Sequence, residues 1–183
     1  MITLLVVVVL ALAAGLARGG SIDALASTRA RWVSLIFAGL VLQTALDLWD
    51  PPWLSSSTGL IVVIASNLLV AAFLVLNNGL PGAWIAGCGL ALNVIVVAAN
   101  GAMPVAPEAA QAGGAEIARR GSIKHEAMGP STALPWLGDV LPVPVFREVL
   151  SAGDILLTAG IGRLVYKRTA EGRQRGRHRA EQA

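Results

Sequence analysis

Hydrophobic residues fill five long stretches of the chain, and most charged residues lie between those stretches. The interval between Asp50 and Glu108 is the extreme case, because its 57 residues include no Lys, Arg, Asp or Glu. A helix rises about 1.5 Å per residue, so about 20 residues cross a hydrocarbon core that is roughly 30 Å thick. The interval therefore predicts two membrane crossings joined by a short turn.

The apolar pattern as a whole predicts five membrane-spanning helices, at residues 2–17, 32–48, 59–76, 82–99 and 149–165. The helix-breaking residues at 77–82 join the third and fourth segments into an antiparallel hairpin. The predicted fold class is all-α, a polytopic membrane helix bundle. Residues 1–166 form this bundle, with an external loop at 100–148, and residues 167–183 form a basic cytoplasmic tail.

The amino-acid composition supports a location in the membrane. Apolar residues make up 55% of the chain and charged residues 14%, whereas an ordinary soluble protein has roughly 25% charged residues. The net charge of +3 comes mostly from the tail after Tyr166, so it indicates orientation and not a nucleic-acid groove. The single cysteine, Cys88, excludes an internal disulfide and a cysteine metal cluster.

The positive charges predict the orientation of the bundle. Five crossings place the stretch between the first two segments on the same side as the tail, and both stretches are rich in basic residues (Arg18, Arg29, Arg31, Lys167, Arg168, Arg173, Arg175, Arg177, Arg179). That side should be the cytoplasm, which leaves the N-terminus outside. We expect the tail to lie against anionic lipid. A cleaved signal peptide at 2–17 is the alternative, but no basic residue precedes that apolar run.

The fifth segment carries a polar stripe. Arg147, Ser151, Asp154 and Thr158 fall within a narrow arc at 100° per residue. An ionised carboxylate that faces lipid costs several kcal/mol, so the stripe should face other helices or water. Asp154 is then a catalytic or ion-binding group, or a structural group paired with Arg147. In the third and fourth segments, Asn67 and Asn93 lie at comparable depth, and we expect a hydrogen bond between them.

Asp139 is the second candidate carboxylate. It lies in the loop at 134–144, which contains too many prolines to form a helix. A sharp loop would bring Asp139 to Asp154, and two adjacent carboxyl groups would share one proton and activate water as acid and base. The alternative is that Asp139 caps a turn and never meets Asp154.

The C-terminal pattern resembles one family of membrane enzymes. The run Ser151-x-Gly153-Asp154-x-Leu156-Leu157-x-x-Gly160, preceded by Gly138-Asp139, resembles the last part of the lipoprotein signal peptidases, which are four-helix membrane aspartyl proteases. The resemblance implies that Asp139 and Asp154 form a catalytic pair. The Phe-Asn-x-Ala and Asn-x-x-Asp-Arg motifs of that family are absent from this sequence.

A second resemblance covers nearly the whole chain. Four elements occur in order: Asn100-Gly101-x-Met103-Pro104-Val105, Lys124-His125, Leu137-Gly138-Asp139 and Ser151-x-Gly153-Asp154. This order resembles a family of uncharacterised bacterial multi-pass membrane proteins, a domain of unknown function. The resemblance implies a multi-pass protein of the plasma (bacterial inner) membrane without implying an activity. It also suggests that Asn100, Lys124 and His125 form an external set with the two aspartates. With Arg147 and Ser151 of the polar stripe, these are the candidate binding residues.

The leading functional hypothesis is an external polar pocket that binds a lipid head group or small molecule, or an accessory role with a protein partner in the membrane. The alternative is an intramembrane aspartyl hydrolase that uses Asp139 and Asp154, so whether the protein is an enzyme stays open. A small transporter is the third hypothesis, although no inverted repeat is apparent. We expect no cofactor, no nucleic acid and no metal, since His125 has no His or Cys nearby.

Overall fold

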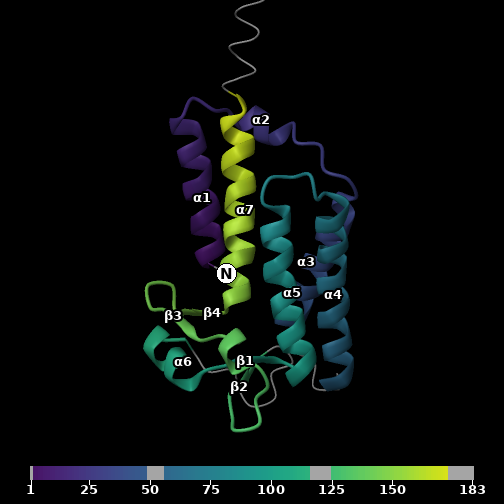
Figure 1. Cartoon of the computed structure of the whole chain (residues 1–183), viewed down its shortest axis with the longest axis vertical. Coiled ribbons are helices and arrows are strands. Elements are labelled where there is room, and N and C mark those ends of the chain that lie inside the picture. Colours follow the sequence, from purple (N-terminus) through teal and green to yellow (C-terminus); the bar gives the residue numbers. More distant parts are fainter. Residues whose placement is uncertain (1, 49–55, 116–124, 173–183) are drawn as a thin grey trace, which may run out of the picture.

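The computed structural model describes residues 2–48, 56–115 and 125–172 of the chain. Its long helices run along one axis (Figure 1), and they are α1 (Ile2–Ala17), α3 (Val33–Leu48), α4 (Ser56–Leu76), α5 (Ala83–Asn100) and α7 (Ala152–Ala170). The short helix α2 (Ile22–Ala26) lies at one end of the bundle. The remaining elements gather at the opposite end.

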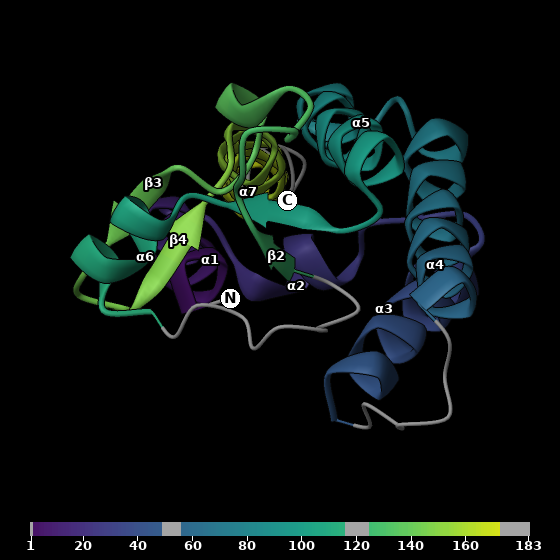
Figure 2. The same cartoon turned by 90° about the horizontal axis from the view of Figure 1, so that it is seen from below.

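The long helices form a curved row when the molecule is viewed from below (Figure 2). Helix α7 packs between α1 and α5, α5 packs on α4, and α4 packs on α3. The predicted hairpin of the third and fourth segments is thus present as α4 and α5. The five predicted segments correspond to α1, α3, α4, α5 and α7.

Helices α5 and α7 approach so closely that only small residues fit between them. A Cβ atom on Gly160 would lie 2.8 Å from the Cα atom of Ala86 and would also overlap the carbonyl oxygen of Gly82. A Cβ atom on Gly89 would overlap the carbonyl oxygen of Gly153. Backbone-to-backbone contact of this kind is typical of helices that pack in membranes.

Two helices in the described part are long and apolar enough to span a membrane, at Ser57–Leu76 and Ala83–Asn100. Only 22% and 28% of these spans are buried inside the protein, whereas a core helix of a soluble protein would be mostly buried. Helix α1 and residues Val33–Ala45 are shorter apolar helices. The fold therefore suggests membrane association, and the count of five crossings stays a prediction.

A small α/β unit, which we call the cap, occupies residues 101–115 and 125–151. It contains helix α6 (Pro107–Gly113), the 3-10 helix η1 (Pro135–Leu137) and four three-residue strands. Strands β1 (Met103–Val105) and β2 (His125–Ala127) pair in parallel, and β3 (Leu141–Val143) and β4 (Glu148–Leu150) pair antiparallel. The prediction of an all-α fold is thus correct only in that the chain is mostly helical, because the predicted loop at 100–148 contains ordered strands.

Polar side chains tie the cap and the connections to the bundle. The carboxylate of Glu148 accepts hydrogen bonds from the backbone N–H groups of Ile2 and Thr3, and from the Thr3 hydroxyl at 2.7 Å. It therefore caps the N-terminus of α1, where free N–H groups and the helix dipole favour a negative charge. Asn77 similarly bonds the backbone of Arg31, which fixes the start of α3 to the turn between α4 and α5.

Candidate functional site

Asp139 is held beside strand β1 by its own backbone. Its N–H group donates to the carbonyl oxygen of Pro104 at 2.8 Å, and its carbonyl oxygen accepts from the N–H group of Ala106 at 2.9 Å. These bonds make Asp139 a parallel bridge partner of Val105. Gly138 permits this approach, because a Cβ atom there would lie 2.6 Å from the methyl carbon of Met128 and 3.2 Å from the Pro104 ring. Asp139 therefore sits at a defined position inside the cap.

The Asp139 side chain is buried, with 6% of its residue surface exposed. One carboxyl oxygen, Oδ2, lies 3.9 Å from Nε2 of His125 on strand β2. The other, Oδ1, is buried without a hydrogen-bond partner in the described structure. Burial, reinforced by the nearby negative charge of Asp154, raises the pKa of the Asp139 carboxyl to about 8. The carboxyl group is therefore mostly protonated at neutral pH.

Asp154 lies in the first turn of α7 and takes part in a closed ring of hydrogen bonds. Its Oδ1 accepts from the side-chain amide of Asn93 at 2.8 Å, and its Oδ2 accepts from the backbone N–H of Ser151 at 3.1 Å. The Ser151 hydroxyl donates to Oδ1 of Asn93 at 2.9 Å and accepts from the backbone N–H of Asp154. Ser151 and Asp154 thus form a capping box, and both carboxyl oxygens act as acceptors, as in an ionised carboxylate.

The ring depends on a glycine beside it. A Cβ atom on Gly153 would overlap the side-chain oxygen of Asn93, so the Asn93 amide reaches Asp154 only because residue 153 has no side chain. Asn93 was not among the predicted site residues. The expected bond between Asn67 and Asn93 is wrong, because Asn67 instead accepts from Gln43 on α3 at 3.4 Å and donates to the Val63 carbonyl.

The two aspartates lie within reach of each other's electric field, since the Asp154 charge contributes to the raised pKa of Asp139. Asp154 is held by Asn93 and Ser151 and not by a cation of the described structure. Arg147 lies exposed in the turn between β3 and β4 with a φ of 53°. The arrangement places the buried Asp139 carboxyl and the His125 imidazole near Asp154, at the junction of the cap with α5 and α7.

The other predicted site residues have separate positions. Asn100 ends α5 and holds the cap, since its Oδ1 accepts from the Ala133 N–H at 2.8 Å and its Nδ2 donates to the Ala133 carbonyl at 2.9 Å. Ser151 is fully buried in the capping box. His125 is partly exposed and borders Asp139. Lys124 falls outside the described residues. Within the described ranges, no group of three His, Cys, Asp or Glu residues is arranged to hold a metal ion.

These features define the class of the molecule as a mostly helical protein with candidate membrane spans and a small α/β cap. Residues 27–166 match the model of a family of unknown function, DUF5317, and the chain belongs to this family. The matched segment includes Asn93, Asp139 and Asp154 and therefore the whole candidate site. Neither the curated proteins nor the solved structures give a match. The resemblance to lipoprotein signal peptidases thus has no support from these comparisons.

Proposed function

We propose that this chain is a multi-pass plasma-membrane protein whose cap faces the outside and binds an ammonium group at Asp139. The topology is supported by the distribution of basic residues. The segments that flank α2 and the last turn of α7 contain five basic residues (Arg18, Arg29, Arg31, Lys167, Arg168). The end of the bundle that carries α2 is opposite the cap (Figure 1). Because basic residues favour the cytoplasmic side, the cap would be external.

The observation that carries the binding proposal is the unpartnered carboxyl oxygen of Asp139. A buried polar atom without a hydrogen bond costs roughly 1 to 3 kcal/mol, so a ligand that donates to Oδ1 would recover that cost. The neighbouring Asp154 charge favours a positive ligand over a neutral one. A primary ammonium group has both features, since it carries a positive charge and three N–H donors. It occurs in the head group of an aminolipid of the outer leaflet and in small soluble amines.

Binding of such a cation would be linked to proton release. Asp139 is mostly protonated at neutral pH because its pKa is raised to about 8. An ammonium group beside Oδ1 would stabilise the ionised form, and the displaced proton would pass to solvent. The nearest imidazole is that of His125, whose Nε2 lies 3.9 Å from Oδ2 of Asp139 and whose side chain is partly exposed.

The aspartyl hydrolase is the second candidate, because a buried carboxyl with a raised pKa lies near a second aspartate, as an acid and base pair requires. A hydrolase would need Asp154 to activate water, yet both of its oxygens already accept hydrogen bonds from Asn93 and Ser151. The transport hypothesis is disfavoured, because α4 and α5 are continuous helices and lack the mid-span breaks that are typical of substrate sites in transporters. Ammonium binding is therefore the function that the geometry supports best.

The test is calorimetric titration of the detergent-solubilised full chain with glycerophosphoethanolamine at pH 7, in two buffers that differ in ionisation enthalpy. We expect nearly one proton released for each bound amine. Glycerophosphocholine is the matched control ligand because its quaternary nitrogen has no N–H donor, and it should bind about tenfold more weakly. Nanodiscs of phosphatidylethanolamine or phosphatidylcholine would then show whether the intact lipid is the source of the amine.

Asp139→Asn should abolish proton release and weaken amine binding, whereas Glu126→Gln, which changes an exposed carboxylate on strand β2, should leave both unchanged. Amine binding that is identical in wild type and Asp139→Asn would overturn the proposal. A hydrolase, by contrast, would lose turnover of a membrane-anchored substrate in both Asp139→Asn and Asp154→Asn without any dependence on soluble amine.

A further inference from the structure

The opposite end of the molecule carries a cavity of about 430 Å³ that is separate from the Asp139 site. It lies where the end of α2 meets the last turn of α7, and it is lined by residues of both elements (Ala24, Ser27, Thr28, Arg29, Arg168, Glu171). The backbone holds these elements together, because the Ser21 N–H donates to the Thr169 carbonyl at 3.0 Å. Gly172 also packs against Ser21. The cavity walls are therefore fixed by main-chain contacts.

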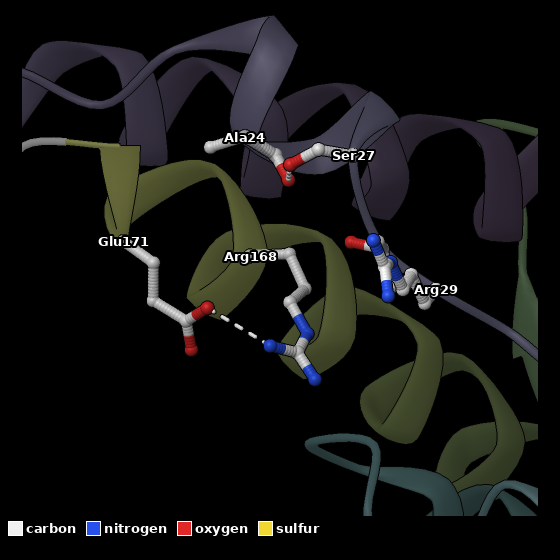
Figure 3. Close-up of a pocket in the computed structure, with 6 residues that line it drawn as sticks. Ala24, Ser27, Arg29, Arg168 and Glu171 are labelled. Atoms are coloured by element: carbon white, nitrogen blue, oxygen red, sulfur yellow. Dashed lines mark hydrogen bonds and ion pairs between the residues drawn. The ribbon is translucent and has the colours of Figure 1, made fainter. Parts of the chain in front are cut away.

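Two arginines face this cavity from different elements (Figure 3). Arg168, on α7, donates to the Glu171 carboxylate at 2.9 Å through Nη1. Arg29, in the segment after α2, lies on the side of Arg168 away from Glu171 (Figure 3). One carboxylate against two guanidinium groups leaves the cavity with an excess of one positive charge. The excess charge therefore favours an anion in the cavity.

Two of the residues that line the cavity also have a buried polar atom that the described protein leaves unsatisfied. Nε of Arg168 and Oγ1 of Thr28 are buried without a hydrogen-bond partner among the described residues. Buried polar groups are nearly always paired with protein, water or ligand, and an unpaired one carries a desolvation cost. Both groups can donate a hydrogen bond, one from a guanidinium N–H and one from a hydroxyl. Nε of Arg168 can only donate, so its missing partner is an acceptor, whereas the Thr28 hydroxyl can either donate or accept.

We propose that this cavity binds a phosphate group, held by Arg29, Arg168 and Thr28. Guanidinium groups match phosphate because their N–H donors form charge-assisted, paired hydrogen bonds with its oxygens. The volume of about 430 Å³ exceeds what a bare phosphate needs and is within the range of small-ligand pockets. The phosphate belongs either to the head group of an anionic phospholipid in the adjacent leaflet or to a soluble phosphate compound.

The test is native mass spectrometry of the detergent-solubilised full chain with three probes: dioleoylphosphatidylglycerol, dioleoylphosphatidylcholine and inorganic phosphate. We expect phosphatidylglycerol to bind in preference to phosphatidylcholine and to be displaced by excess phosphate. If inorganic phosphate binds and phosphatidylglycerol does not, the phosphate site stands and its natural ligand is soluble. Failure of both anions to bind overturns the proposal.

Arg29→Gln and Arg168→Gln should each weaken binding of the anion about tenfold, because each removes a charge-assisted contact. Arg29 is exposed and lies outside the helices, so its replacement should disturb the fold less, and this variant keeps the test valid if Arg168→Gln fails to fold. Arg163→Gln is the matched control, since Arg163 is an exposed arginine on α7 that does not line the cavity. Equal weakening in Arg163→Gln would show a general charge effect and refute the site. All variants keep residues 173–183, so any contribution of the basic tail is constant.

Discussion

The raised pKa of Asp139 predicts that the folded protein loses stability as the pH rises. The folded chain retains the proton on Asp139 up to about pH 8, whereas the unfolded chain releases it near the ordinary value of 3.8. Between these values the folded state binds more protons than the unfolded state, so the free energy of unfolding falls with increasing pH. The stabilising contribution of the neutral acid is complete below about pH 4 and is lost as the pH rises to about 8.

The size of this effect follows from the two pKa values. A tenfold change in proton affinity corresponds to about 1.4 kcal/mol, so the change from 3.8 to about 8 corresponds to roughly 6 kcal/mol. Between pH 5 and pH 8 the expected loss is roughly 4 kcal/mol, with a slope of about 1.4 kcal/mol for each pH unit. Asp139→Asn keeps the shape of the neutral acid and cannot ionise. The variant should therefore lack this component of the slope.

The assay is reversible unfolding in mixed micelles by titration with sodium dodecyl sulfate, followed by tryptophan fluorescence at pH 5, 6, 7 and 8. The quantity to compare is the difference in the free energy of unfolding between wild type and Asp139→Asn at each pH. Contributions from groups that titrate in both proteins cancel in this difference. His125→Gln serves as the second control, since the His125 imidazole is titratable and lies 3.9 Å from the Asp139 carboxyl. The slope should persist in that variant. Parallel pH curves for wild type and Asp139→Asn would refute the assignment of a buried, protonated acid.

Two further predictions concern packing and use the same unfolding assay at one pH. Glu148→Gln removes the charge that caps α1 and should destabilise the protein by about 1 to 3 kcal/mol, whereas Glu126→Gln, at an exposed position of strand β2, should change stability little. Gly160→Ala forces a methyl group against the α5 backbone and should cost about 1 to 3 kcal/mol. Gly87→Ala adds the same methyl group on α5 where no atom lies within 4 Å, so it should be neutral or slightly stabilising. Similar losses in the variant and its control would contradict either prediction.

The long helices were predictable because long apolar runs end at breakers. The first predicted segment, residues 2–17, has the bounds of α1, and the predicted spans at 59–76 and 82–99 lie within three residues of α4 and α5. The fifth segment was misplaced, since α7 covers Ala152–Ala170 and not 149–165. The hydropathy pattern carries no signal for the capping box at Ser151, so the predicted start was too early. The predicted end was also too early, because the last turn of α7 is basic and not apolar. The capping box, and not apolarity, determines where α7 begins.

The cap was not predictable from periodicity, because its strands have only three residues and pair with distant segments. Strand β1 pairs with β2 across a long insertion, and Asp139 joins β1 through backbone bonds that leave no trace in side-chain pattern. The predicted hydrogen-bond partner of Asn93 was wrong for a related reason. Asn93 and Asn67 lie at similar depth in the hairpin of α4 and α5, which led to the prediction of a bond between them. The rotation of each helix about its axis instead turns Asn93 toward α7 and Asn67 toward α3.

The positions of the small residues along α5 indicate which face of that helix is turned toward α7. Gly82, Ala86 and Gly89 contact α7, and Asn93 follows them at the same helical spacing, so it lies on the face toward Asp154. The same helix also positions Asp139, because β1 begins shortly after α5 ends and Asn100 fixes the cap to that end. Both carboxyl groups are thus positioned relative to α5, one through Asn93 and the other through β1. Because α7 carries Asp154, whose charge adds to burial in raising the Asp139 pKa, we expect a change in the packing of α7 on α5 to alter the proton affinity of Asp139.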